Sequence, residues 1–265
     1  MGQMSAKRFF DIGWSALMRT VPAGRVSDVG WLIDAERAGF IWEAPTRLRL
    51  TATDSRHAKS VTACPAVIDQ ESRYFVVPCP ISARLKVRID PSTGEATVAN
   101  AAGDQSAIRT KSLGELVKRV NAREWRHPER PILQFVTPYV FIADDPVYMN
   151  QLPPFAFRPN PSLPGLMIGG RFPINVWPRH LMWAFEWHNT DEELVLRRGD
   201  PWFYVGFETE DPSSRIRLVE AEFTPALKEY MAGTRSVTSF VSQTFSLFKT
   251  ARERRPKKLL VKKDR

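Results

Sequence analysis

The sequence predicts a mainly β protein of the α+β class, an antiparallel β-barrel or sandwich with a few peripheral helices. Three observations carry this prediction: several segments alternate apolar and polar residues, short turn-rich stretches separate them, and segments with helical spacing are few. With 265 residues, of which 43% are hydrophobic and 25% charged, the chain is able to bury a sizeable core. We expect a single β-rich domain over residues 1–248 and a basic C-terminal arm over residues 249–265.

Two elements are expected in the first eighty residues. Residues 9–18 have the spacing of a short amphipathic helix, which Gly13 weakens. Residues 64–77 contain two apolar runs around a polar stretch and predict a β-hairpin. This hairpin would bring Cys64 and Cys79 close together, and because the chain has only two cysteines we expect reduced thiols, with a disulfide as the alternative.

A second hairpin is expected over residues 84–99. Apolar and charged residues alternate strictly in its first half, and the turn at residues 91–94 leads into its second half. A short helix follows, because Ser112 and Glu115 have the spacing of a capping box and apolar residues continue at helical spacing.

The middle of the chain changes character. Two apolar runs, residues 132–136 and 139–143, predict strands separated by a kink at Pro138. Prolines and glycines then punctuate residues 146–178, where we expect regular structure not to persist. A long apolar loop usually packs against a protein surface or has a function. We expect this segment to be either a boundary between two domains or a loop that covers one domain.

The clearest strand signal lies in residues 181–223. Every second residue from Leu181 to Trp187 is large and apolar, which predicts a strand with one aromatic face. Short turns then join further expected strands over residues 193–197, 202–208 and 215–223. Four successive strands of this kind predict an antiparallel meander or barrel.

Two helices are expected after these strands. Thr224 and Pro225 cap and open the first helix, which Gly233 ends. The second helix carries an apolar stripe that we expect to pack on the protein's own core. The stripe consists of Val237, Phe240, Val241, Phe245 and Phe248.

The net charge of +9 is concentrated in the last 17 residues, where nine positive and two negative side chains give +7. This distribution indicates a basic, flexible arm instead of a basic domain face. Such an arm binds a nucleic-acid backbone without reading its sequence, or an acidic patch on a protein; the alternative is a solvated tail that aids solubility. The apolar residues 259–261 favour docking of the arm. The candidate binding residues are Arg252, Arg254, Arg255, Lys257, Lys258, Lys262 and Lys263.

Three residues are candidate metal ligands: His180, Glu186 and His188, which share one face of the expected strand. His188, Glu192 and Gly199 have the spacing of the second half of a cupin metal motif. In cupins, two histidines one residue apart, a glutamate and a later histidine hold a divalent metal, because imidazole and carboxylate suit Fe, Mn, Zn and Ni. Here Glu186 stands in place of the first histidine, and no histidine follows His188. Exposed turn residues are the competing interpretation.

The same block resembles a second fold. A strand, the turn Asn189-Thr190-Asp191, a strand, the turn Gly199-Asp200 and another strand resemble the pattern of dUTPase-like β-clip proteins. The substrate-binding motifs of those enzymes are not visible here. The resemblance therefore implies a jelly-roll-like or β-clip-like barrel, and by itself it gives no basis for assigning nucleotide hydrolysis.

A wider resemblance rests on five short segments between Val61 and Phe223. The segments are Cys64-Pro65-Ala66-Val67, Gln151-Leu152-Pro153-Pro154, Gly169-Gly170-Arg171-Phe172, Trp183-Ala184-Phe185 and Gly199-Asp200-Pro201-Trp202-Phe203-Tyr204. They resemble an uncharacterised protein family encoded by tailed bacteriophages. The resemblance implies a phage or prophage origin and carries no activity to individual residues.

Other catalytic templates are absent from the sequence. It has no Gly-rich phosphate loop, no Gly-x-Ser-x-Gly, no His-Glu-x-x-His and no Cys/His zinc cluster, and Asp144-Asp145 before Pro146 is most simply a turn. No run of 18 apolar residues and no signal-peptide pattern occur, so we expect no membrane partner. Together with this absence, the phage resemblance implies a location in the host cytoplasm or the virion.

The leading functional hypothesis is therefore a non-enzymatic, phage-type structural or accessory binding protein without a cofactor. Its basic arm contacts nucleic acid or an acidic protein. A cupin-like metal-dependent enzyme and a β-clip nucleotide binder or hydrolase are the alternatives. The oligomeric state stays open, with a homo-oligomer among the options.

Overall fold

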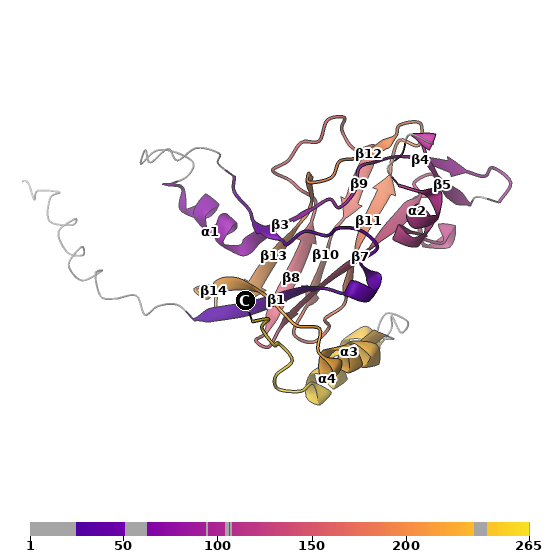
Figure 1. Cartoon of the computed structure of the whole chain (residues 1–265). Coiled ribbons are helices and arrows are strands. Elements are labelled where there is room, and N and C mark those ends of the chain that lie inside the picture. The colour runs from indigo at the N-terminus through magenta and orange to yellow at the C-terminus, as the bar shows by residue number, and fades with distance from the viewer. Residues whose placement is uncertain are drawn as a thin grey trace, which may run out of the picture.

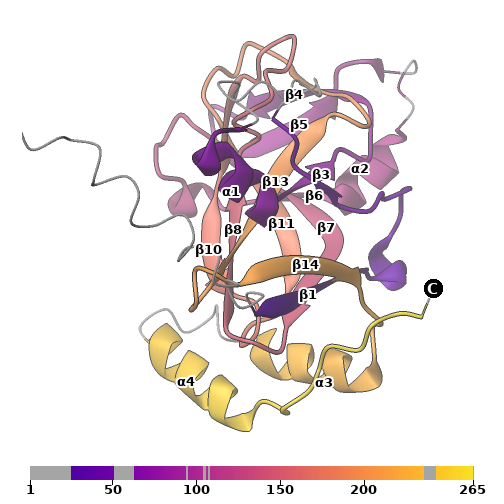
Figure 2. The same ribbon diagram turned by 90° about the vertical axis from the view of Figure 1, so that its left-hand side faces the viewer.

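The computed structural model of the chain describes residues 25–50, 63–93, 95–103, 106, 108–235 and 243–264. It confirms a mainly β fold with a few helices. Two large curled sheets face each other, a small third sheet lies at one end of the molecule, and two helices lie at the opposite end (Figure 1 and Figure 2). The expected helix at residues 9–18 lies outside the described residues.

The strands are distributed as follows. The first sheet has the order β14 (Arg215–Glu220), β1 (Val26–Ile33), β7 (Ile132–Ala143), β11 (His180–Trp187) and β9 (Gly165–Ile168), and β6 (Val117–Arg119) also pairs with β7. The second sheet has the order β10 (Gly170–Pro173), β8 (Val147–Leu152), β13 (Pro201–Thr209), β3 (Tyr74–Pro78) and β2 (Thr46–Arg47). The third sheet has the order β12 (Leu194–Leu196), β4 (Ala83–Ile89) and β5 (Ala96–Asn100).

Four α-helices lie around the sheets within the described residues. They are α1 (Pro65–Arg73), α2 (Thr110–Leu116), α3 (Pro225–Thr234) and α4 (Thr244–Arg254), with short 3-10 turns at Ala35–Arg37 and Ala122–Glu124. Helices α3 and α4 lie side by side below β1 and β14 in both views (Figure 2). None of the described helices is long and apolar enough to cross a membrane.

The core lies between the two large sheets. The Phe141 ring of the first sheet meets the Phe207 ring of the second at 5.7 Å between centroids, and Phe135 meets Trp202 in the same way at 6.0 Å. The predicted aromatic face of residues 181–187 is confirmed, because all four of its large side chains are buried in this core. Aromatic side chains at every second position of β11 therefore form much of the contact between the sheets.

Two further expectations are confirmed. The hairpin over residues 84–99 forms as β4 and β5, paired from Leu85 and Asn100 to Ile89 and Ala96. The Thr224 hydroxyl caps α3 by accepting a hydrogen bond from the backbone N–H of Leu227 at 3.2 Å, and the helix runs one residue beyond Gly233.

The hairpin expected over residues 64–77 is wrong. Only its second half is a strand; the first half is helix α1, with Pro65 at its first position, where the missing N–H costs nothing. The Asp69–Arg73 ion pair at 3.1 Å, four residues apart, supports the helix. Cys64 is exposed, Cys79 is buried, and both are free thiols, as expected.

The expected capping box at Ser112 is also wrong. The N-cap of helix α2 is Arg109, three residues before Ser112, and it makes no side-chain hydrogen bond to the helix. Val117 leaves the helix and begins β6, where it pairs with Phe135 of β7, and Val120 lies just beyond this strand. Pairing with the edge of a large sheet thus overrides the helical spacing of this short segment.

The two apolar runs around Pro138 form one strand of 12 residues instead of two. The register between β7 and β11 shifts around Leu181, so the missing N–H of Pro138 falls at an irregular site of the ladder. The Thr137 hydroxyl donates to the Leu181 carbonyl oxygen at 2.9 Å, and the Pro138 carbonyl oxygen accepts from the Asp34 N–H at 2.9 Å. These bonds keep the strand continuous.

The expectation that regular structure ends in residues 146–178 is wrong as well. Strand β8 lies inside the second sheet, and β9 and β10 form edges of the first and second sheets. Gly169 separates β9 from β10, where a Cβ atom would approach the Gln151 carbonyl oxygen to 2.7 Å. The chain thus passes from one sheet to the other at this edge, and irregular structure is confined mainly to residues 153–164 and 174–179.

The predicted meander of four successive strands is wrong. β11 lies between β7 and β9, β12 pairs with β4, β13 lies between β8 and β3, and β14 pairs with β1 in parallel. Side chains on both faces of β13 are buried, from Trp202 to Phe207, so this strand needs neighbours in the centre of a sheet. Local alternation identifies strands but not their partners.

Candidate nucleic-acid interface

Helix α4 is anchored to the body by aromatic side chains. The Phe248 ring lies 5.4 Å from the Trp177 ring. The Tyr230 hydroxyl of α3 lies 2.7 Å from the Val176 carbonyl oxygen and 3.2 Å from that of Ala251 in α4, and donates its single proton to either. Of the predicted apolar stripe, Phe248 packs as expected, Phe245 is exposed, and Val237, Phe240 and Val241 lie outside the described residues.

Arg255, which follows α4, is the main polar anchor of the C-terminal segment. Its side chain is 8% exposed and forms an ion pair with Asp144 at 2.7 Å from Nη2 to Oδ1. The same guanidinium donates to the carbonyl oxygens of Ala143 and Asn175. The Asp144 carboxylate also accepts the backbone N–H groups of Leu259, at 2.9 Å, and Leu260. The Asp144 carboxylate therefore binds both ends of the segment 255–260.

The residues after this anchor pack on the outer face of the first sheet. Leu259 and Leu260 are buried against Leu32, Val140 and Ile142, as their apolar character predicted. Gly30 leaves the space, because a Cβ atom there would lie 2.3 Å from Leu260 Cδ1. An antiparallel bridge pairs Lys262 with Ala221. The basic arm is therefore docked, which corrects the expectation of a flexible arm.

Three of the seven candidate binding residues are used in docking. Besides Arg255, Lys262 lies 2.6 Å from Asp28 and Lys263 lies 2.6 Å from Glu220. The hydrogen bond from Arg217, with a further one from Lys262, lowers the pKa of the Asp28 carboxyl despite its partial burial. The hydrogen bond to Glu220 raises the pKa of Lys263. Arg255 is largely buried against its carboxylate, whereas the side chains of Lys262 and Lys263 pair with carboxylates and stay 49% and 58% exposed.

The other four candidates are exposed and form no ion pair within the described residues. They lie on the last turn of α4 and just after it, and Lys249, three positions before Arg252 on the same helix, joins them. The docked segment thus presents five unpaired cations, and Glu253 is the one acidic residue in the stretch 249–258 that carries them. The five are Lys249, Arg252, Arg254, Lys257 and Lys258.

The structure separates the three candidate metal ligands. His180 Nε2 lies 2.8 Å from Asp34 Oδ2 at one end of β11. Burial lowers the pKa of this imidazole, although the hydrogen bond to Asp34 acts to raise it. Six residues along a strand span about 20 Å, so Glu186 lies far from it, near the other end of β11. In the described part of the chain, no three His, Cys, Asp or Glu side chains are grouped so as to hold a metal ion.

Glu186 and His188 do lie together. Glu186 Oε2 is 3.2 Å from His188 Nε2, and Arg126 forms an ion pair with the same oxygen. Burial acts to raise the pKa of the Glu186 carboxyl, but the hydrogen bonds from Arg126 and His188 together lower it. The carboxylate is therefore already satisfied by two donors, which explains its almost complete burial.

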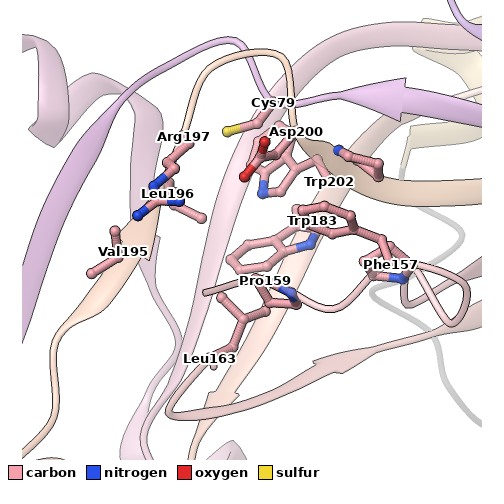
Figure 3. A pocket seen from close by; sticks show the side chains of 12 residues that line it. Cys79, Phe157, Pro159, Leu163, Trp183, Val195, Leu196, Arg197, Asp200 and Trp202 are labelled. Atoms are coloured by element: carbon pink, nitrogen blue, oxygen red, sulfur yellow. The ribbon is translucent and has the colours of Figure 1, made fainter. Parts of the chain in front are cut away.

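A cavity of about 30 Å³ lies between the loop at residues 153–164 and the core. Figure 3 shows the indole rings of Trp183 and Trp202 side by side in it, with Cys79 and Asp200 at one end and Leu163 at the other. Neither indole N–H has an acceptor within the described residues. Burial raises the pKa of the Cys79 thiol to about 12, so the thiol is neutral. The volume is that of one water molecule in the liquid, too small for a substrate.

Sequence reasoning missed the acidic partners of the arm. Asp144 was expected only as a turn residue. Asp28 lies in β1 and Glu220 in β14, and these strands pair in parallel although Asp28 and its partner Arg217 are 189 positions apart in the sequence. No local pattern relates such distant residues. The excess of apolar residues at 259–261 was the one signal of docking, and the structure confirms it for Leu259 and Leu260.

No family model, curated protein or solved structure matches this chain.

Proposed function

We propose that this protein binds nucleic acid without catalysing a reaction, through the phosphate contacts of the exposed cations on α4 and the segment that follows it. One observation carries the proposal. Carboxylates of the body form ion pairs with Arg255, Lys262 and Lys263 and so hold the segment in place. Five further cations lie on the surface of this ordered segment and form no ion pair within the described residues. They are Lys249, Arg252, Arg254, Lys257 and Lys258.

This arrangement favours backbone contact over sequence reading. Flexible Lys and Arg side chains on a convex helix end suit phosphate oxygens, which are spaced regularly along a duplex. Order also reduces the conformational entropy lost on binding, compared with a flexible tail.

A pair of matched variants tests the proposal. The first replaces Arg252, Arg254, Lys257 and Lys258 by Gln; the control replaces Lys262 and Lys263 by Gln. Binding of a fluorescently labelled 20-base-pair duplex is followed by anisotropy. The first variant is expected to lose most of the affinity, and the control to keep it, because its cations already face Asp28 and Glu220. Equal losses in both variants would refute the assignment of the interface.

The acidic-protein alternative is separated by a second probe. If any acidic polymer suffices, polyglutamate of matched charge displaces the labelled duplex as effectively as unlabelled duplex does. Under the proposal polyglutamate competes poorly, since condensed counterions are released from a duplex and much less from a peptide.

The phage origin, the virion or host-cell location and the oligomeric state stay predictions from the sequence. The two enzymatic alternatives gain no support from the geometry. The cupin-like ligand set is divided between the two ends of β11, and the cavity beside the Gly199-Asp200 turn is too small for a nucleotide.

A further inference from the structure

Within the described residues, two sheet edges lack a further strand on the side of the molecule away from the β9–β10 crossing. The first sheet ends at β14 and the second ends at β2, and these strands do not pair with each other. Figure 2 shows β14 and β1 crossing the front of the molecule with the strands of the second sheet behind them. The chain therefore connects the two sheets at the β9–β10 edge, whereas β14 and β2 at the opposite edge are not paired with each other.

A groove of about 490 Å³ lies between the two open edges. Its walls are apolar side chains on and beside the two sheets together with three arginines, and none of the described residues that line it is acidic. The apolar residues are Val26, Trp31, Pro45, Phe75, Ile216 and Leu218. The arginines are Arg47, Arg215 and Arg217.

The backbone of β14 is available at this groove. Successive residues of a strand direct their N–H and C=O groups to opposite sides. Arg215 donates its N–H to Arg25 beside β1, so the odd-numbered residues of β14 face β1 and the even-numbered ones face outward. Within the described residues, Ile216 and Leu218 make no backbone hydrogen bond on this outer side.

The same edge already accepts an added strand at its far end. The Lys263 N–H donates to the Glu220 carbonyl oxygen at 3.0 Å, and the Glu222 N–H donates to the Val261 carbonyl oxygen at 2.9 Å. The outward groups of Glu220 and Glu222 are thus satisfied by an extended segment, in antiparallel pairing. The geometry of this edge is compatible with strand addition. Helix α1 contacts β14, and the first half of the strand makes no outward backbone hydrogen bond within the described residues.

The charge of the groove selects its occupant. Arg215 is exposed and forms no ion pair within the described residues, and Arg47 donates to carbonyl oxygens while lying 5.0 Å from the Phe75 ring centroid. Of the three arginines only Arg217 faces a carboxylate, that of Asp28. A second copy of β14 would place arginines opposite arginines, which is unfavourable in a strand pair. An acidic strand is complementary.

We propose that the groove binds an extended acidic segment of a partner protein, which adds to β14 as a strand. Its backbone pairs with Ile216 and Leu218, its apolar side chains enter the groove, and its carboxylates face Arg215 and Arg47. This inference is independent of the nucleic-acid interface, which lies on α4 and the segment after it.

Two labelled heptapeptides test the proposal by anisotropy, one alternating Glu and Val and one alternating Lys and Val. The Glu peptide is expected to bind saturably, and the Lys peptide not to bind. Leu218→Pro removes an outward N–H that β1 does not use, so the variant is expected to fold and to weaken Glu-peptide binding by about tenfold. Arg215→Glu, at an exposed side chain, is expected to weaken it similarly, and the control Lys258→Glu to leave it unchanged.

Three results would overturn the proposal. They are no saturable binding of the Glu peptide at millimolar concentration, equal binding of both peptides, and unchanged binding in Arg215→Glu. If Arg215→Glu instead abolishes binding of an oligonucleotide and leaves the Glu peptide unaffected, the groove is a nucleic-acid site and the proposal is wrong. Arg215→Glu decides the matter if Leu218→Pro fails to fold.

Discussion

Replacing Asp144 by Asn tests the docking of the C-terminal segment. The variant keeps the size of the side chain but removes the charge that faces Arg255 and weakens the acceptor of the Leu259 and Leu260 N–H groups. Because the Arg255 side chain is 8% exposed, the guanidinium stays largely buried without its carboxylate partner. The segment is then expected to detach more readily from the first sheet.

The size of the effect follows from these contacts. Breaking a buried ion pair costs about 3–5 kcal/mol, and a hydrogen bond to a charged group contributes about 1.5–3 kcal/mol. Here Asp144 is 29% exposed and Arg255 keeps its bonds to two carbonyl oxygens, so we expect a loss of about 2 kcal/mol in docking free energy. This loss raises the undocked population about thirtyfold.

Amide hydrogen exchange at Leu259 and Leu260 and the rate of trypsin cleavage after Lys258 measure that population. Both are expected to increase strongly in Asp144→Asn. The control is Asp145→Asn, whose ion pair with Arg25 is largely exposed and contributes less than about 1 kcal/mol. Unchanged exchange in Asp144→Asn, or an equal increase in the control, would refute the anchoring role of Asp144.

Three further predictions follow from burial. Gly30→Val is expected to displace Leu260 and to lower the thermal unfolding midpoint, measured by circular dichroism, because a Cβ atom would lie 2.3 Å from the leucine side chain; an unchanged midpoint would contradict the packing. Burial lowers the pKa of His180 in the folded protein, so stability is expected to fall as the pH drops below about 6.5, and urea titrations of His180→Gln should show a flatter profile. In native protein, a thiol reagent is expected to label Cys64 and to spare Cys79 until denaturant is added, because burial raises the Cys79 pKa to about 12; rapid labelling of both would contradict that burial.

Local features of the fold could be predicted from the sequence. The strict alternation of β4 and the aromatic face of β11 identify buried faces without knowledge of partners. The Thr224-Pro225 start of α3 is a local signal too, since the cap bonds a residue three positions away. In each case the interactions that determine the structure lie within a few residues of one another.

Features that depend on distant contacts could not be predicted. The strand order follows from burial of both faces of β13 and from pairings such as β1 with β14, which no local pattern encodes. Helix α1 was not predicted, because its apolar residues Ala66–Ile68 have the composition of a strand, although none of them is buried. The candidate site was found in part: net charge located the basic segment, but only the structure divides paired from unpaired cations.

The salt dependence of duplex binding by the unmodified protein tests the central claim most directly. Each phosphate contact contributes about 0.9 to the slope of log affinity against log salt, so contacts from the five unpaired cations predict a slope of about −4.5. A slope of that size would agree with a phosphate interface built from these side chains. Absence of duplex binding at low salt, or binding that salt leaves unchanged, would contradict it.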